Sequence, residues 1–175
     1  MTTDERQSRH EAAMTTARMM MTAARTAPKA KGVDIIEIAV VDGVELESLS
    51  RQMNAYGQTA GRPSFIRDAR NVSQSECVVL IGTRPRPMGL NCGFCGHPTC
   101  EAKPCGEPCA FNSIDVGIAV GSACATAADC RVDTRVMYSA GLAAEQLGML
   151  DGCRQIIAIL VSISSKSPYF DRPAM

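Results

Sequence analysis

The sequence predicts one α/β or α+β domain with an inserted cysteine-rich loop. Segments with the apolar spacing of helices alternate with short runs of β-branched residues, which is typical of a sheet flanked by helices. At about 150 residues per domain, a chain of 175 residues corresponds to about one domain. We therefore expect a single domain over residues 1–175, with a loop at 84–111 inserted between a strand and a central helix.

The individual elements follow from periodicity and from residues that interrupt it. Apolar residues recur at helical spacing before Pro28 and again after Gly43, and unbroken apolar runs mark the strands. The polar stretch at 57–76 is interpreted as a loop because Gly61 and Pro63 lie in it. The expected elements are a helix at 5–27, a strand at 35–41, a helix carrying Leu46, Leu49, Met53 and Tyr56, a strand at 77–81, a helix at 112–129, a strand at 134–138, a helix at 142–149 and a strand at 156–163.

The helix expected at 112–129 has an unusual composition. Its central part carries no charge and many small residues, including Gly117 and Gly121. Each of these glycines costs about 1 kcal/mol relative to alanine, so packing must offset the loss. We expect a buried helix that other backbone segments approach closely, with Asn112 or Ser113 as its N-cap.

Charge and targeting signals restrict the partners and the compartment. Lys+Arg and Asp+Glu are both 18, so the net charge is zero and a generally basic nucleic-acid surface is excluded. No signal-peptide pattern is visible at the start. The longest strongly apolar run, Ile156–Val161, is far shorter than the roughly 18 residues of a membrane helix. Nine cysteines without an export signal indicate a reducing cytoplasm. We expect a cytoplasmic protein that neither binds nucleic acid nor inserts into a membrane.

Cysteine is the informative residue type. Five of the nine cysteines fall between Cys92 and Cys109, with the spacing C-x2-C-x4-C-x4-C-x3-C. A C-x2-C step lets two thiolates converge on one metal centre, and the glycines beside it permit tight turns. Four thiolates around one compact centre are what a 4Fe–4S cluster requires. The predicted ligands are Cys92, Cys95, Cys100 and either Cys105 or Cys109; we favour Cys109 because it directly precedes the helix, whose N-terminus favours a thiolate.

Two other interpretations of the cysteines stay open at this point. Structural zinc sites usually pair two C-x2-C knuckles, whereas this block has one knuckle followed by single cysteines. Cysteines with no metal are the remaining alternative. His97 lies inside the block and is expected to support the loop rather than bind metal. The cysteines outside the block have no partner at motif spacing and are expected to fill the core; they are Cys77, Cys124, Cys130 and Cys153.

Two short segments carry local positive charge. Arg84 and Arg86 precede the cysteines and are interpreted as a solvated loop, with docking of an acidic redox partner as the functional alternative. Lys29 and Lys31 follow the first helix and either lie exposed at the helix end or approach a cofactor phosphate. No acid–base pair or nucleophile stands out, so we assign no catalytic residue.

Several segments resemble an uncharacterised prokaryotic family described as containing a ferredoxin domain, over about residues 14–172. The matching segments are MTAARTAPKAKG (21–32), VVLIG (78–82), LNCGFCGHPTC (90–100), PCAFNSID (108–115) and RVDTRVMYSAGLAAEQLG (131–148). The stretch Cys92–Cys100 is also similar to the cluster motif of the corrinoid iron–sulfur protein large subunit. These resemblances imply a 4Fe–4S cluster, and the family resemblance implies Cys109 as the fourth ligand.

A second resemblance is to flavin-dependent nitroreductases. Their first helix ends in Ala-Pro, as at Ala27 and Pro28 here. They also have a long central helix in the dimer interface, and the helix expected at 112–129 would match that helix. This resemblance implies a nitroreductase-like mixed sheet flanked by helices, a homodimer and FMN. In nitroreductases a pair of arginines near the N-terminus binds the FMN phosphate. This pair has no clear match in the present sequence, because Arg6 and Arg9 are spaced differently.

Three functions follow as hypotheses. The first is an electron-transfer module or redox subunit with one 4Fe–4S cluster. The second is an FMN-dependent, nitroreductase-like oxidoreductase that also carries a cluster. The third is a non-catalytic assembly or sensor subunit that the cluster stabilises.

Overall fold

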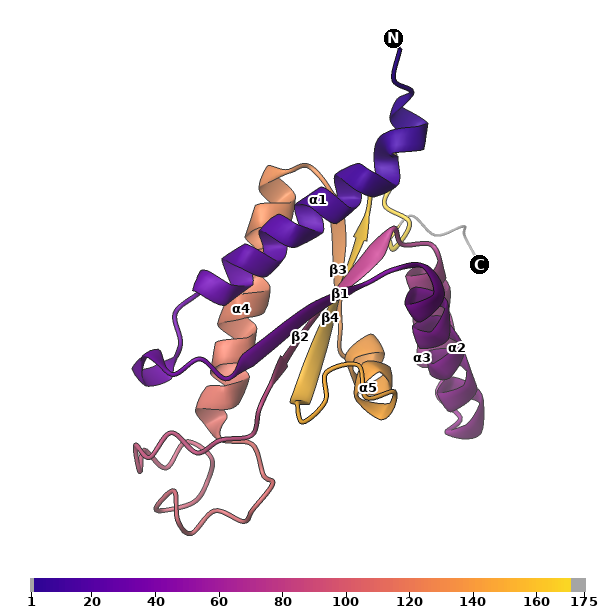
Figure 1. The fold of residues 1–175 in the computed structure, drawn as a ribbon. Coiled ribbons are helices and arrows are strands. Elements are labelled where there is room, and N and C mark those ends of the chain that lie inside the picture. Colours follow the sequence, from indigo (N-terminus) through magenta and orange to yellow (C-terminus); the bar gives the residue numbers. More distant parts are fainter. Residues whose placement is uncertain (1, 171–175) are drawn as a thin grey trace.

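The computed structural model describes residues 2–170 (Figure 1). Met1 and residues 171–175, which the predicted domain includes, lie outside the described residues. The elements are α1 (Glu5–Thr26), the short 3-10 turn η1 (Ala30–Gly32), β1 (Ile36–Val41), α2 (Gly43–Thr59), α3 (Pro63–Ser73), β2 (Cys77–Thr83), α4 (Ala110–Asp129), β3 (Asp133–Met137), α5 (Tyr138–Gln146) and β4 (Arg154–Ser162).

The four strands form one sheet in the order β1-β2-β4-β3. All three pairings are antiparallel within the described residues. The α+β class with helices flanking the sheet is confirmed, but the expected mixed sheet is wrong in this detail. The reason is the connection between β1 and β2. The helices α2 and α3 form an antiparallel pair that returns the chain to the end of the sheet it left, so that Val41 at the end of β1 lies opposite Val78 near the start of β2.

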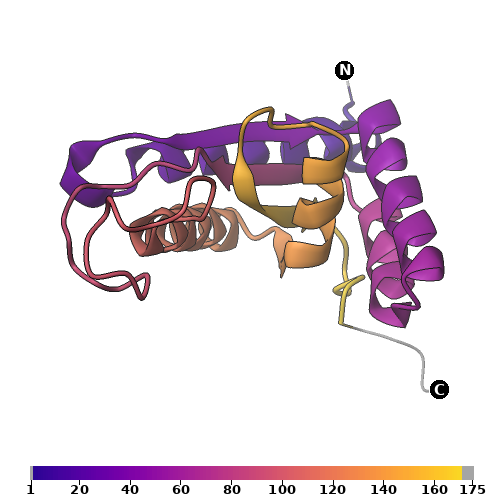
Figure 2. The same ribbon diagram turned by 90° about the horizontal axis from the view of Figure 1, so that it is seen from below.

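Helices cover both faces of the sheet, which gives three layers (Figures 1 and 2). On one face α1 and α4 pack against Cys77, Val79 and Ile81 of β2. On the other face α2, α3 and α5 pack against Val78 and Leu80 of the same strand. Every residue of β2 is therefore buried, which explains why this strand is a continuous apolar run rather than an alternating one.

The helix α3 corrects the expected loop at 57–76. Pro63 begins this helix, because the first turn of a helix needs no N–H donor at that position. Phe65, Ala69 and Val72 are buried along one side of α3, at helical spacing. A Cβ on Gly57 would lie 2.8 Å from Ile66 Cγ1, so this glycine allows α2 and α3 to approach closely.

The helix α4 begins earlier and is less enclosed than expected. Its N-cap is Cys109, not Asn112 or Ser113. Val116, Ala119, Ala123 and Ala127 pack onto the sheet and α1, whereas the opposite side of the helix is exposed. Within residues 2–170 the expected close backbone approach at Gly117 and Gly121 does not occur, since no other described part of the chain lies within 4 Å of a Cβ built on either glycine.

Among residues 2–170, α4 is also the one helix long and apolar enough to cross a membrane, by length and composition alone. Its buried side, however, forms part of the core between α1 and the sheet. Packing in the core therefore accounts for the apolar residues on the buried side of α4.

Candidate metal centre

The cysteine block lies in an irregular loop that joins β2 to α4. The loop lies at one end of the sheet, beyond the first turn of α4 (Figure 1). Several residues have positive φ, the backbone region that favours glycine, and they are Gly89, Asn91, Gly93, Gly96 and Gly106. The glycines let the chain reverse direction repeatedly, so that cysteines distant in sequence face a common hollow.

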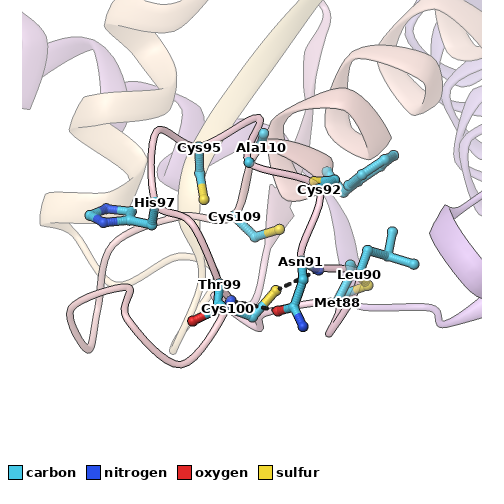
Figure 3. Close-up of a pocket in the computed structure, with 12 residues that line it drawn as sticks. Met88, Leu90, Asn91, Cys92, Cys95, His97, Thr99, Cys100, Cys109 and Ala110 are labelled. Carbon is cyan, nitrogen blue, oxygen red and sulfur yellow. Dashed lines mark hydrogen bonds between the residues drawn. The ribbon is translucent and has the colours of Figure 1, made fainter.

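The four favoured ligands line one hollow. Figure 3 shows Cys95, Cys100 and Cys109 with their sulfur atoms directed toward it, and Cys92 lines the same hollow. Cys105 is exposed and is not among the lining residues. Its neighbour Gly106 instead lines a separate hollow beside the turn between α5 and β4.

The lining suits a cluster of iron and sulfide. Cys109 is buried, Cys95 and Cys100 are partly exposed, and Cys92 is exposed. No three His, Cys, Asp or Glu side chains within residues 2–170 are arranged to hold one metal ion. A 4Fe–4S cluster places each thiolate on a different iron, so its ligands surround a larger body than a single ion does. Four cysteines spread around a hollow fit that requirement.

Asn91 fixes the position of Cys100, a role that the sequence did not reveal. The Asn91 side-chain oxygen accepts a hydrogen bond from the Cys100 N–H at 2.8 Å. The Asn91 N–H in turn donates to Cys100 Sγ at 3.4 Å. Asparagine tolerates the positive φ of 48° at this position. The sequence signal was an asparagine immediately before the first cysteine.

Cys109 is held by the first turn of α4. The Asn112 N–H donates to the Cys109 carbonyl oxygen at 2.9 Å, and the Asn112 side-chain oxygen accepts from the Cys109 N–H at 3.1 Å. These two hydrogen bonds close the first turn of α4 onto Cys109. The positive end of the helix dipole lies at Cys109 and favours negative charge there.

Apolar and aromatic groups enclose the rest of the hollow. Ile35 and Met88 pack with Cys109 in a small buried cluster. Phe111 lines the hollow, and the ring of Phe94 stacks on it at 5.9 Å between centroids. Phe94 is itself 69% exposed, so the side of the centre that carries Phe94 faces solvent.

His97 lines the hollow, and its ring is engaged by an acidic side chain. Its Nε2 lies 3.0 Å from Glu107 Oε2. The Lys103 ammonium also donates to the Glu107 carbonyl oxygen. These contacts close the part of the loop that carries Cys105, and they agree with the expected supporting role of His97.

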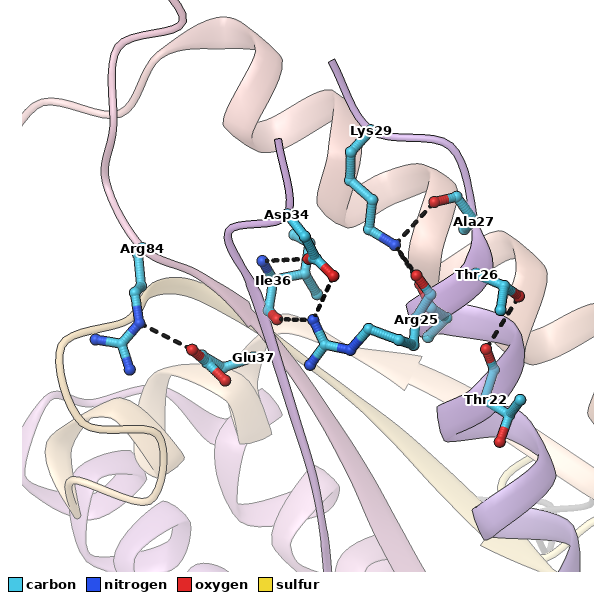
Figure 4. A network of polar contacts seen from close by, with 10 residues as sticks. Thr22, Arg25, Thr26, Ala27, Lys29, Asp34, Ile36, Glu37 and Arg84 are labelled. Carbon is cyan, nitrogen blue, oxygen red and sulfur yellow. Dashed lines mark hydrogen bonds and ion pairs between the residues drawn. The ribbon is translucent and has the colours of Figure 1, made fainter. Parts of the chain in front are cut away.

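The lysines that were candidates for binding a cofactor phosphate make hydrogen bonds to the main chain, and Figure 4 shows those of Lys29. Lys29 donates to the carbonyl oxygens of Ala24 and Ala27 at the end of α1, and burial lowers the pKa of its ammonium. Lys31 donates to the Met88 carbonyl at 3.1 Å and so supports the cysteine loop.

The arginines near these elements are paired with carboxylates. Arg25 pairs with Asp34 at 2.8 Å, and Arg84 pairs with Glu37 at 2.9 Å (Figure 4). Arg9 pairs with Glu5 at 3.0 Å near the start of α1. These three arginines are therefore engaged by carboxylates.

The cysteines outside the block lie apart from the centre. Cys77 and Cys153 are buried, and Cys124 and Cys130 are partly exposed. Burial raises the pKa of the Cys77 thiol to about 12, so this group stays protonated at neutral pH. Cys77 therefore behaves as a small apolar side chain in the core, as expected.

Comparison with known proteins gives the family. Residues 105–172 match the family described as "Uncharacterized protein containing a ferredoxin domain (DUF2148)". An "Uncharacterized protein" of Archaeoglobus fulgidus is 42% identical over 179 aligned positions, which cover 97% of this chain and 96% of that protein. The chain belongs to this ferredoxin-domain family. The matched segment contains Cys109 and Cys105 but begins after the other three cysteines of the hollow.

Solved structures with a similar fold belong to nitroreductases. A nitroreductase-like protein from Bacillus cereus has a TM-score of 0.60 at 12% identity, covering 92% of this chain and 80% of that one. A nitroreductase with bound FMN from Desulfitobacterium hafniense has a TM-score of 0.58 at 16% identity, covering 95% and 80%. At this identity the likeness establishes the fold, and it confirms the nitroreductase-like architecture of this ferredoxin-domain protein.

A buried carboxylate beside the loop leads to a prediction about pH. Asp115 is 1% exposed, and its two oxygens accept from the Ala30 N–H at 3.1 and 3.2 Å. Burial raises the pKa of this carboxyl above its unfolded value of about 3.9. The folded state therefore holds this proton more tightly, and this group's contribution to stability falls as pH rises through the interval between the two pKa values.

The variant Asp115→Asn keeps an acceptor for Ala30 and removes the ionisation. We expect its free energy of unfolding at pH 7 to lie within about 1 kcal/mol of the wild-type value. We also expect the variant to lack the decrease in stability that the ionisation of Asp115 causes in the wild type as pH rises. Asp115→Ala leaves the Ala30 N–H without an acceptor and is expected to lose about 1–3 kcal/mol. Chemical denaturation at pH 3.5, 5 and 7 measures both effects. A pH profile that is identical in Asp115→Asn and wild type would contradict the assignment.

Proposed function

We propose that this protein is an electron-transfer module or redox subunit that carries one 4Fe–4S cluster on Cys92, Cys95, Cys100 and Cys109. The observation that carries the proposal is the hollow around which the loop and α4 gather these four cysteines and not Cys105. Membership in a ferredoxin-domain family supports it. The cluster, when bound, supplies one-electron chemistry, and the protein supplies binding, orientation and electrostatics.

The chain's own groups would tune this centre. The N–H group of Asn91 donates to the sulfur of Cys100, and bonds of this kind to ligand sulfur help to set the reduction potential. Ile35 and Met88 limit access of water from the protein side. The exposed Cys92 would bring the centre to the surface, where an electron would pass to a redox partner protein.

The proposed setting follows from the surface and the fold. A net charge of zero provides no electrostatic attraction to nucleic acid, and the apolar side of α4 is used within the core. We therefore propose a soluble, cytoplasmic protein with no nucleic-acid partner and no membrane insertion, in keeping with free thiols in a reducing compartment.

A flavin enzyme is the second candidate. The observation that favours it is the nitroreductase-like fold, since one protein of similar fold contains bound FMN. The pairing of Arg9, Arg25 and Arg84 with carboxylates weighs against a phosphate site at these residues. A third candidate, an assembly or sensor subunit, would show a fixed stoichiometry with a partner and no change in the cluster on reduction.

One preparation tests the first proposal and its alternatives. Anaerobic purification should give a brown protein with about four irons and four sulfides per chain and a reduced-state EPR signal. Metal analysis distinguishes iron from zinc, and added FMN shows whether flavin absorbance stays with the protein. A colourless protein without iron after reconstitution would contradict the proposal.

The choice of fourth ligand is tested by paired serine variants. Cys109→Ser should lose most of the iron, because it removes the buried ligand at the N-terminus of α4. Cys105→Ser is the matched control and should keep wild-type iron content, because this exposed side chain does not line the hollow. The opposite pattern, with Cys105→Ser emptying the site, would show that the assignment is wrong.

We also propose a homodimer formed through the exposed side of α4. From Ile114 to Ala128 this side carries no charge, and exposed residues recur along it at the spacing of a heptad seam. The residues at its start are large, and those toward its end are small: Ile114 and Ile118, then Gly121, Ala125 and Ala128. Two copies related by a two-fold axis with α4 antiparallel would place the large residues of each against the small residues of the other.

The variant Ile118→Lys should break this dimer. It brings a charge into an interface that must contact its own copy, so we expect the dimer Kd to rise at least about 100-fold. Light scattering after gel filtration should give twice 18.6 kDa for the wild type and 18.6 kDa for the variant. Val44→Lys is the control, because Val44 is 77% exposed on α2. A wild-type monomer at high concentration would contradict the proposal.

A further inference from the structure

We propose that Asn112 is a positioning residue of the cluster centre, fixing Cys109 relative to the segment that enters the cysteine loop. The inference rests on the proposed cluster but concerns a residue that is not a ligand. Asn112 is fully buried, with 0% of its surface exposed. A buried amide must have its donors and acceptors satisfied, and both partners of this one lie on the backbone at opposite ends of the loop.

Three hydrogen bonds define the role of the Asn112 side chain. Its oxygen accepts from the Cys109 N–H at 3.1 Å and from the Arg86 N–H at 3.2 Å. Its nitrogen donates to the Arg86 carbonyl oxygen at 3.0 Å. One side chain therefore joins Arg86, in the segment that enters the loop after β2, to Cys109, at which the loop ends.

The sequence around Arg86 explains why an asparagine is needed. Arg86 lies between Pro85 and Pro87, and proline has no N–H. The Arg86 N–H is thus the one backbone donor between Arg84 and Met88. The amide of Asn112 pairs with both the N–H and the carbonyl of Arg86, as a neighbouring strand would, in a segment where the sheet has already ended.

The loop has few other bonds to the rest of the fold. Arg84 donates its N–H to the Ile35 carbonyl at the sheet edge, and Lys31 donates to the Met88 carbonyl. Both bonds hold the entering segment only. Among the described hydrogen bonds, those of Asn112 connect that segment to Cys109 and to the first turn of α4, beside the packing of Met88 on Cys109. Asn112 therefore fixes Cys109 relative to the segment from which the loop with the other three cysteines continues.

The test is cluster retention in Asn112 variants of the reconstituted protein. Asn112→Ala removes all three bonds, and we expect iron release to an Fe²⁺ chelator to accelerate at least about 10-fold, with a changed EPR signal of the reduced cluster. Asn112→Asp keeps an acceptor for both N–H groups and loses the donor to Arg86, so its release rate should lie between those of Asn112→Ala and the wild type.

Asn71→Ala is the matched control. Asn71 is a buried asparagine on α3, on the other face of the sheet, and its side-chain nitrogen has no hydrogen-bond partner. This variant shows what a general change in stability does to cluster release, and we expect a wild-type EPR signal. Circular dichroism and thermal unfolding compare the folding of all variants.

The outcomes separate the two proposals. A wild type that binds no cluster overturns the proposed function. A wild type that binds a cluster, with Asn112→Ala releasing iron at the rate of Asn71→Ala and keeping the wild-type EPR signal, overturns the positioning role alone. If Asn112→Ala fails to fold, Asn112→Asp decides: wild-type release and EPR overturn the role, and faster release with an altered signal supports it.

Discussion

The candidate centre depends on one constraint, which is that an irregular loop must be held at the point where it joins the core. The loop contains turns but no helix or strand, so few of its own backbone bonds fix its shape. The hydrogen bonds between Cys109 and Asn112 connect the end of the loop to α4. Since α4 packs on α1 and the sheet, the position of Cys109 is determined by the core. The other cysteines are placed relative to that fixed point.

Much of the fold could be predicted from periodicity because the sheet is buried on both faces. The apolar runs of β2 and β4 and the spacing in α1 and α2 leave little ambiguity. α3 was missed because Pro63 was interpreted as an interruption, whereas a proline at the first helical position is compatible with a helix. The start of α4 was missed because cysteine is an uncommon N-cap. Helix propensity read residue by residue predicts neither α3 nor the start of α4. The packing of α3 decides the first, and the cap at Cys109 decides the second.

The candidate site was predictable to a different extent. The spacing of Cys92, Cys95 and Cys100 indicated a metal centre, because cysteines so close in sequence must lie close in space. The supporting residues were not predictable in the same way. Asn91 and Asn112 act through bonds to backbone groups that the loop brings together only after folding. Lys29 and Lys31 carry positive charge in the sequence, but in the structure they satisfy main-chain carbonyls.

The helix α4 takes part in both the proposed cluster centre and the proposed homodimer. Its first turn holds Cys109, and its exposed side begins at the aromatic pair that borders the hollow. Phe111, Ile114 and Ile118 continue from that pair along one side of the helix. In an antiparallel dimer the small residues near the end of the partner's α4 would face this border. Dimer formation would then restrict access of water to the side of the centre that a single chain leaves open, and it would do so without adding a ligand.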